Sequence, residues 1–454
     1  MDLTKSQRSG DVGVVRVRGL TRGQLLRGAA AASAGGAGAA LAACATPQGS
    51  APAAGNTPVT LTLWDRKEAL YPSYMEKWLP TFYARRPHIT VDYVATGEAN
   101  SDKFIPAAAA GTPPDVLMCN GRQPRNHFEN KLIVPLDKYI RASRLDTDDF
   151  LQGIYKGFGE AGQQFGIPQF VNVNFMFYNR TAFQRAGVPF PKDDWTHDQL
   201  LDTARRLTQG PLSSRETWGI GTPFSAVTVR VASLLWGQCA QFTDPKDNSV
   251  FTWGAAENLK AFQWAHDIAW RQRLAPLNEA ERGGLPLVDA FFTRGNVAIL
   301  LEGGHWIAEW KAKAQVEWDV AALPKGPCGR GERGAMDAYL MPAGVKTPDA
   351  SWQLIEAITD KEANKLRSDV VNLPPARKSQ WDHWSQGLPD KNLKVGVPTD
   401  SVRPDPGSYF HPDVQRALGP IWVSLFDRNE ISVADALKQA REATAGVVGA
   451  EKSR

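Results

Sequence analysis

The sequence predicts an α/β fold in which an open, mostly parallel sheet is covered by helices on both faces. Between residues 59 and 119, runs of alternating apolar and polar residues take turns with segments whose apolar residues recur every three or four positions. These are the periods of strands and helices. Helices of about ten residues or more between successive strands favour parallel pairing. The 454 residues are too many for one ordinary core and fit two domains with extra segments.

The first five elements follow a β-α-β-α-β order. A strand is predicted at 59–65 (VTLTLWD), and a helix with one apolar face follows over 71–84. Residues 88–94 alternate as a second strand. A second helix is predicted over 99–110 and a short apolar strand at 115–119.

Similar alternation continues along the chain. Residues 170–179 (FVNVNFMFYN) are predicted as a strand, and a helix is predicted to begin after Thr196, which has the capping-box spacing to Gln199. Further short strands are predicted at the following segments: 217–221, 296–301, which a Gly-Gly turn joins to another helix, and 318–324.

The N-terminus has the layout of an export signal. An uncharged, Ala- and Gly-rich run at 28–43, too short to span a bilayer comfortably, is preceded by Arg16, Arg18, Arg22 and Arg27. We therefore expect residues 1–43 to be a signal peptide. The run ends in Leu-Ala-Ala-Cys44, which resembles the lipobox of bacterial lipoproteins and implies lipidation of Cys44. Residues 44–57, rich in Pro, Ala, Gly and Ser, are expected to form a flexible linker.

The export route is left open by the sequence. Residues 21–27 (TRGQLLR) resemble a twin-arginine motif, but Gly23 stands where the second arginine belongs. Both the general secretory route and the twin-arginine route therefore remain.

The charge distribution argues against nucleic-acid binding. The formal charge of +4 comes from residues 1–43, and the remainder of the chain carries equal numbers of basic and acidic side chains. Nucleic-acid binding normally needs an excess of Lys and Arg. No zinc-type cysteine spacing occurs, and we expect no metal and no cofactor. Beside Cys44, the three cysteines Cys119, Cys239 and Cys328 could form one disulfide, whose pairing is left open.

Four ordered blocks resemble a known family, the extracellular solute-binding proteins of bacterial ABC sugar importers. The first is GIPQFVNVNFMFYNRTAFQRAGVPFPKDDW at 166–195. The others are FFTRGNVA at 291–298, followed by EGGHW at 302–306, then WDVAALPKGP at 318–327, and finally LPPAR at 373–377. The blocks keep the family order over roughly residues 58–380.

The resemblance implies a periplasmic-binding-protein-like fold of two α/β lobes joined by a hinge of crossing strands. Lobe one would comprise 58–168 and 292–342, and lobe two 169–291 and 343–446. It further implies that a mono- or oligosaccharide is captured between the lobes and passed to an ABC permease and its ATPase. The protein would be a monomer without enzymatic activity, anchored through Cys44 on the outer face of the cytoplasmic membrane, at the cell surface or in the periplasm.

Candidate ligand-binding residues lie where strands end, the edge at which open α/β sheets bind ligands. Sugar sites combine aromatic faces with planar polar groups that pair with hydroxyls. The residues that fit this description are Trp64, Asp65, Asn120, Arg122, Phe170, Asn172, Asn174, Trp236, Glu302, Trp306, Asp337, Tyr339 and Arg377. For Trp236 a place in the core is an open alternative, and for Asp65 and Arg377 a place on the surface.

Two other functions remain open at this stage. The ligand could be another small solute, such as a polyol, a peptide or a polyamine. A secreted glycoside hydrolase needs only two carboxylates, which the sequence contains. The sequence has neither an H-E-x-x-H nor a G-x-S-x-G motif, and its seven histidines are scattered.

Overall fold

The computed structural model describes residues 57–67, 70–96, 100–121, 124–244, 247–396, 402–408, 410 and 412–452. The predicted signal peptide, Cys44, most of the predicted linker and Arg122 lie outside the described residues. In the part of the chain that is described, no helix is long and apolar enough to cross a membrane.

The first third of the chain confirms the predicted alternation. Its elements are β1 (Val59–Asp65), α2 (Leu70–Arg85), β2 (Ile89–Ala95), α3 (Asn100–Ala109), β3 (Val116–Asn120), α4 (Pro124–Glu129), α5 (Asp137–Ser143), α6 (Gln152–Lys156), the two-residue strands β4 (Gly159–Glu160) and β5 (Gln163–Gln164), and β6 (Gly166–Asn179).

Helices dominate the rest. The elements are α7 (Arg180–Arg185), α8 (His197–Leu207), α9 (Ala232–Gly237), β7 (Thr243–Asp244), β8 (Asp247–Phe251), α10 (Ala256–Ala269), α11 (Leu287–Asp289), β9 (Ile299–Gly303), α12 (His305–Trp310), β10 (Trp318–Ala321), β11 (Arg333–Leu340), α13 (Pro348–Ile358), α14 (Lys361–Val371), α15 (Trp381–Gln386), β12 (Arg403–Pro404), α16 (Pro412–Trp422) and α17 (Val433–Lys452).

Two local predictions have opposite outcomes. Helix α8 begins with the predicted capping box, since Thr196 and Gln199 bond each other's backbone N–H. The strand predicted at 217–221 is wrong. Trp218 and Gly221 make only isolated bridges, to Val297 and Leu300. Residues 217–221 therefore do not form a ladder.

The α/β class is confirmed, but the sheet is mixed rather than mostly parallel. Its strands follow the order β10-β6-β11-β3-β1-β2, with β9 on β6 and β12 on β11. Strand β1 pairs in parallel with β2 and β3. Strand β11 runs antiparallel to β3 and β6, and β6 runs antiparallel to β9 and β10. The central strands are antiparallel because the chain crosses from one half of the molecule to the other along β6 and returns along β11.

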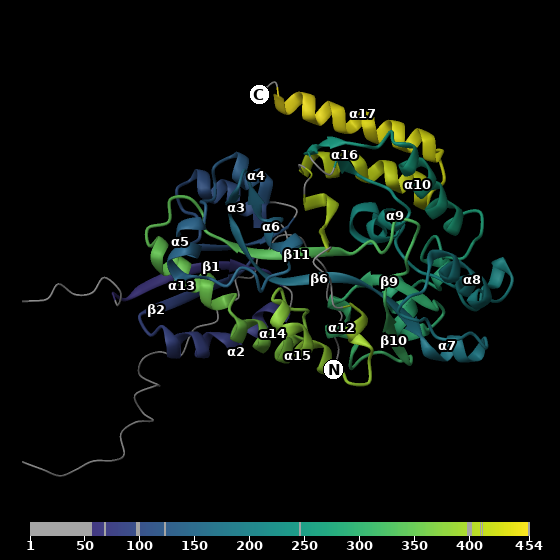
Figure 1. Cartoon of the computed structure of the whole chain (residues 1–454), viewed down its shortest axis with the longest axis horizontal. Coiled ribbons are helices and arrows are strands. Elements are labelled where there is room, and N and C mark those ends of the chain that lie inside the picture. Colours follow the sequence, from purple (N-terminus) through teal and green to yellow (C-terminus); the bar gives the residue numbers. More distant parts are fainter. Residues whose placement is uncertain are drawn as a thin grey trace, which may run out of the picture.

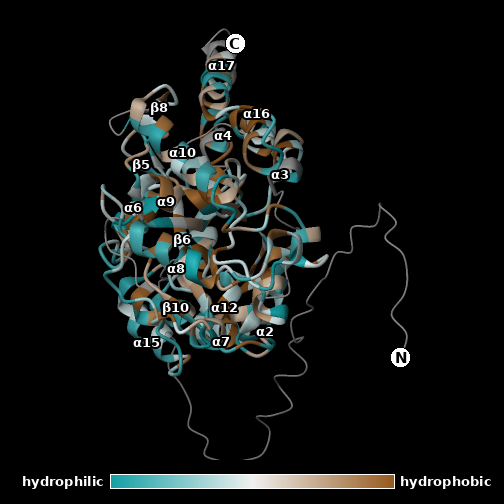
Figure 2. Ribbon diagram, turned by 90° about the vertical axis from the view of Figure 1, so that its right-hand side faces the viewer, coloured by the Kyte–Doolittle hydropathy of each residue, from teal (hydrophilic) through white to brown (hydrophobic). Residues whose placement is uncertain are grey.

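The helices and strands form two halves (Figure 1), and each half has its own hydrophobic core. In the first half, β1–β3 pack with α2, α13 and α14 around a cluster that contains Leu63, Trp78 and Ile355. In the second half, α8–α10, α16 and α17 surround a cluster that contains Phe262 and Trp422. Helix α17 lies along the outer edge of the second half, beside α16 (Figures 1 and 2).

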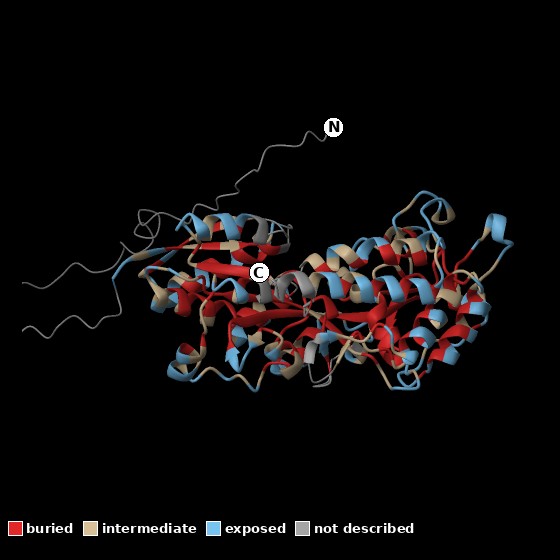
Figure 3. Cartoon of the chain, turned by 90° about the horizontal axis from the view of Figure 1, so that it is seen from above, coloured by how far each residue is buried: buried red, intermediate tan, exposed pale blue. Residues whose placement is uncertain are grey.

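The strands join the two halves through a third buried cluster. Val171, Phe175 and Phe177 of β6 belong to it, together with Ala338 of β11. Seen from above, buried ribbon runs without a break from one half into the other (Figure 3). Strand β6, at 14 residues, is long enough to contribute its first part to the first half and its second part to the second half.

The predicted lobe boundaries need two corrections. Strands β9 and β10 pair with the second part of β6, and Leu301 and Ala321 pack in the core of the second half, not in lobe one. Helices α13 and α14 pack on β1 and α2 in the first half, not in lobe two. Strand pairing decides these placements, and no single segment of sequence carries that information.

Candidate functional site

Asp65 lies at the end of β1 in a fully buried position. Its two carboxylate oxygens accept hydrogen bonds from the Tyr339 hydroxyl at 2.9 Å and from the Arg66 backbone N–H at 2.8 Å. Burial raises the pKa of Asp65 to about 6, although these hydrogen bonds and the nearby charge of Arg367 act in the opposite direction. The surface position considered for Asp65 is therefore wrong, and Tyr339 is its direct partner.

Arg66 connects this end of β1 to β11. Its guanidinium forms an ion pair with Asp337 at 2.9 Å, with 13% of the arginine side chain and 3% of the aspartate side chain exposed. The Tyr71 hydroxyl lies 3.4 Å from the same Asp337 oxygen, and its ring lies under the guanidinium and beside Phe170. An aromatic pair, a cation and a carboxylate therefore lie together in the first half.

Glu302 is the centre of a matching group in the second half. One of its oxygens accepts from Arg230 Nε at 2.5 Å, from Trp306 Nε1 at 3.2 Å and from the Gly303 N–H at 3.0 Å. Glu302 is buried, whereas Arg230 and Trp306 are half-buried. The donors converge because β9 ends at Gly303 and α12 starts at His305, which brings Trp306 back over the carboxylate.

The side chain of Asn172 holds His305 in one tautomer. Asn172 Oδ1 accepts from the His305 backbone N–H at 3.1 Å, so the amide Nδ2 is the group that faces His305 Nδ1 at 2.9 Å. Because Nδ2 can only donate, Nδ1 must accept, and the neutral ring carries its proton on Nε2.

Alternate residues of β6 connect the two groups. Phe170 lies beside Tyr71, Asn172 bonds His305, and Asn174 bonds the Arg230 carbonyl. The pKa of His305 is lowered to about 3, first by burial and then by the charges of Arg230, Arg66 and Arg333. Arg66 belongs to the first half and Arg230 to the second, so charges from both halves act on the pKa of this imidazole.

Asn174 and Arg333 form a buried link beneath the site. Asn174 donates to the Arg230 carbonyl at 3.1 Å and accepts from Arg333 at 3.0 Å. Arg333, whose side chain is 0% exposed, pairs with Asp405 at 2.6 Å. This link connects β6, β11 and the segment after β12.

Most of the residues that were predicted from the sequence lie in or next to this group. Asn120 stands opposite Asp337 in the register of β3 and β11, and it is half-buried. Trp64 is also half-buried and packs against the cluster that joins the halves. The residues that the structure brings together are Asp65, Phe170, Asn172, Asn174, Glu302, Trp306, Asp337 and Tyr339.

Two predicted residues have other surroundings. Trp236 is 7% exposed and packs in the core of the second half, under Arg403 and beside Phe242. Arg377 is buried against Phe150 and bonds Asp149 and the Thr359 carbonyl. The surface position considered for Arg377 is therefore wrong, and its contacts are internal to the first half.

Five residues of the group were not singled out from the sequence: Arg66, Tyr71, Arg230, His305 and Arg333. Arg66 and His305 had a signal, since each is adjacent in sequence to a predicted residue. Arg230 had none, because it reaches Glu302 from a helical turn that is 72 positions away. Among the described residues, no three His, Cys, Asp or Glu side chains gather as a metal site.

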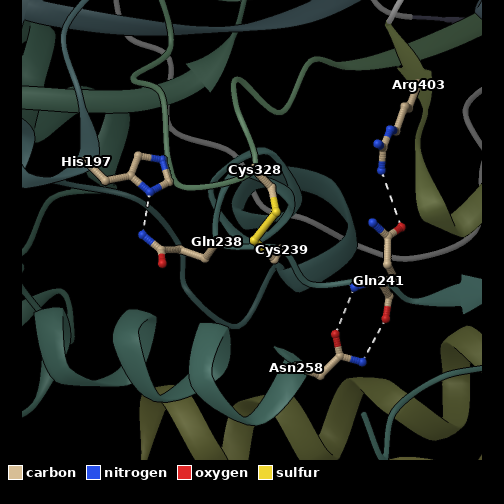
Figure 4. Close-up of a disulfide and its surroundings, with 7 residues drawn as sticks. All are labelled: His197, Gln238, Cys239, Gln241, Asn258, Cys328 and Arg403. Atoms are coloured by element: carbon tan, nitrogen blue, oxygen red, sulfur yellow. Dashed lines mark hydrogen bonds between the residues drawn. A yellow bond between two sulfur atoms is a disulfide. The ribbon is translucent and has the colours of Figure 1, made fainter. Parts of the chain in front are cut away.

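A disulfide between Cys239 and Cys328 lies in the second half, near His197, Gln238 and Arg403 (Figure 4). It ties the end of α9 to the segment that leads from β10 to β11. The Cys328 N–H also donates to the Gly237 carbonyl, and a Cβ on Gly326 would lie 2.2 Å from that same oxygen. Cys119 is free and buried. One of the pairings left open by the sequence is therefore formed.

Comparison with known proteins agrees with this architecture. The family model of bacterial extracellular solute-binding proteins matches residues 66–365. A binding protein of Brucella abortus is 24% identical over 317 residues, which are 68% of this chain and 73% of the relative. A maltooligosaccharide ABC transporter solute-binding lipoprotein of Streptococcus pneumoniae is 22% identical over 317 residues, 67% of this chain and 70% of the relative.

Two solved structures show the same two-lobed fold. An ABC substrate-binding protein from Listeria monocytogenes in complex with cycloalternan has a TM-score of 0.73 at 18% identity, over 86% of this chain and 99% of that one. UgpB from Mycobacterium tuberculosis in complex with glycerophosphocholine has a TM-score of 0.72 at 17% identity, over 87% of this chain and 100% of that one.

Proposed function

The chain belongs to the bacterial extracellular solute-binding protein family, and from this premise we propose that it captures a carbohydrate, a mono- or oligosaccharide, for an ABC importer. The relatives support this ligand class. One is named as a maltooligosaccharide-binding lipoprotein, and structures of the same fold hold cycloalternan and maltose.

One observation carries the proposal: an aromatic ring lies beside an arginine–carboxylate pair in each half. Buried Tyr71 lies beside Arg66 and Asp337, and half-buried Trp306 lies beside Arg230 and Glu302. Trp306 bonds Glu302, and Arg230 bonds the same carboxylate. A sugar hydroxyl both donates and accepts, so an ion pair offers it a partner for each role. An indole face suits the C–H face of a sugar ring. We propose that the ligand lies here, with Trp64, Asn120 and Asn172 as further contacts.

The partners and the location follow from the same premise. We expect an ABC permease and its ATPase to receive the ligand, and we expect Cys44 to carry the lipid anchor after export. The disulfide between Cys239 and Cys328 supports an oxidising compartment, because cytosolic thiols are normally kept reduced. We further expect the protein to act as a monomer and to release its ligand unchanged.

The experiment is thermal unfolding of the protein with a panel of mono- and oligosaccharides, polyols, amino acids and peptides. A ligand at about 100 times its Kd stabilises the native state by roughly 2.7 kcal/mol, which raises the midpoint by several degrees. A shift with a sugar that is recovered intact supports the proposal. A shift only with an amino acid or peptide would contradict the ligand class, and a cleaved sugar would indicate an enzyme.

A further inference from the structure

Each of the two partly exposed arginines of the site forms an ion pair with a carboxylate. Arg66 pairs with Asp337 at 2.9 Å, and Arg230 pairs with Glu302 at 2.5 Å. The arginine side chains are 13% and 18% exposed, and the carboxylates 3% and 6%. Part of each arginine side chain is therefore exposed to solvent, whereas the carboxylate that it pairs with is buried.

The third arginine follows the same pattern in a deeper position. Arg333 is completely buried and pairs with Asp405 at 2.6 Å. The three arginines whose charges act on His305 are thus matched by three carboxylates. Within these three pairs of described residues, the summed charge is zero.

His305 adds a neutral donor to this balanced set. The Asn172 amide leaves the ring proton on Nε2, and the imidazole stays uncharged at neutral pH because its pKa is about 3. A neutral N–H can donate to a hydroxyl oxygen without contributing charge.

This balance disfavours an anionic ligand. A phosphate that approached Arg230 would also approach Glu302, and like charges repel more strongly in a partly desolvated site than in water. A hydroxyl meets no such repulsion and can use the donor and the acceptor of the pair together.

We propose that this site selects an uncharged polyhydroxylated ligand and excludes phosphate-bearing ones, with Asp337 and Glu302 as the excluding groups and His305 as a neutral donor. The inference rests on the proposed function and narrows its ligand class. The fold alone does not decide between the two ligand classes, because the similar structures include both a cycloalternan complex and a glycerophosphocholine complex.

The test removes one carboxylate and asks whether an anion then binds. The variant is Glu302→Gln, which keeps the shape and frees the charge of Arg230. The matched control is Glu309→Gln on α12, the helix that follows β9, since Glu309 is exposed and pairs only with Lys313 among the pairs described. The thermal midpoint is measured with about 10 mM glycerol 3-phosphate against sodium chloride of equal ionic strength.

We expect no shift for the wild type and for Glu309→Gln, and a rise of about 2 to 4 degrees for Glu302→Gln. If Glu302→Gln does not fold, as judged by circular dichroism, Asp337→Asn tests the same point by removing the carboxylate that pairs with Arg66. The inference is overturned if removal of the paired carboxylate yields no stabilisation by glycerol 3-phosphate. It is also overturned if glycerol 3-phosphate stabilises the wild type and Arg230→Gln abolishes the effect.

These outcomes are separate from the fate of the proposed function. If the wild type binds phosphorylated sugars in place of neutral ones, the protein is still a solute-binding protein and only this inference is contradicted. If no sugar of either kind stabilises the wild type while Glu302→Gln acquires phosphate binding, the charge balance stands and the carbohydrate assignment is contradicted.

Discussion

At the scale of single residues, the site combines groups that a sequence reveals with groups that it hides. Asp65 and Glu302 could be predicted because each follows a strand, where open sheets bind ligands. Their contact with Tyr339 and with Trp306 respectively is now visible. Arg230 could not be predicted, because nothing in the sequence around this helical turn indicates that its long, flexible side chain pairs with Glu302.

Asp65 gives a pH-dependent prediction. Its pKa in the folded protein is about 6, compared with an ordinary value of 3.8. Between these values the folded state keeps a proton that the unfolded state has lost, so the free energy of unfolding falls as the pH rises. In Asp65→Asn this contribution is absent, and the amide can still bond Tyr339 and the Arg66 N–H.

As the pH rises from 4 to 7, we therefore expect the free energy of unfolding of Asp65→Asn to increase relative to that of the wild type, by on the order of 2 to 3 kcal/mol. Urea unfolding at several pH values measures this difference. If the difference in unfolding free energy between the two proteins is the same at pH 4 and pH 7, the raised pKa of Asp65 is contradicted.

Trp306 gives a prediction about binding. Truncation in Trp306→Ala removes both the ring face and the Nε1 donor to Glu302. We expect the affinity for the sugar to fall by roughly 10- to 100-fold. Trp306→Phe keeps a ring and is expected to lose less. Titration calorimetry compares the three proteins, and equal affinities would remove Trp306 from the site.

At the scale of elements, local chemistry was predicted well and pairing was not. The capping box of α8 was predicted, because both of its partners lie within three residues. The strand at 217–221 was predicted wrongly, because its alternation is real but its partners offer only isolated bridges. Local patterns therefore predict which segments are extended, and distant partners decide whether they form a ladder.

The disulfide is the clearest stabilising feature at this scale. It closes a loop between residues separated by 89 positions. It also fixes the segment just before β11 to the end of α9. We expect the double variant Cys239→Ser, Cys328→Ser to unfold with a free energy lower by about 3 to 5 kcal/mol. Urea titration with and without a reducing agent measures this. The reductant should destabilise the wild type but not the double variant, and a wild type insensitive to complete reduction would contradict the prediction.

At the scale of the whole molecule, the chain crosses between the halves along β6 and β11, and this arrangement explains the corrected boundaries. Family order predicted two lobes and a hinge of strands. It did not predict that β9 and β10 pair with the far end of β6, or that α13 and α14 return to the first half. Those placements depend on contacts between segments more than 100 residues apart.

The same arrangement predicts a change of shape. If the halves close around the ligand, as in hinge-type motion, the radius of gyration in small-angle scattering should fall when a stabilising sugar is added. A ligand that raises the thermal midpoint and leaves the scattering curve unchanged would contradict closure.

The central claim is that the protein binds a carbohydrate and leaves it intact. Equilibrium dialysis against maltose, a maltooligosaccharide and cycloalternan, with mass spectrometry of the recovered sugar, tests it most directly. We predict saturable retention of at least one of these sugars at one molecule per chain, with its mass unchanged. Retention of none of them, or recovery of shortened products, would contradict the account.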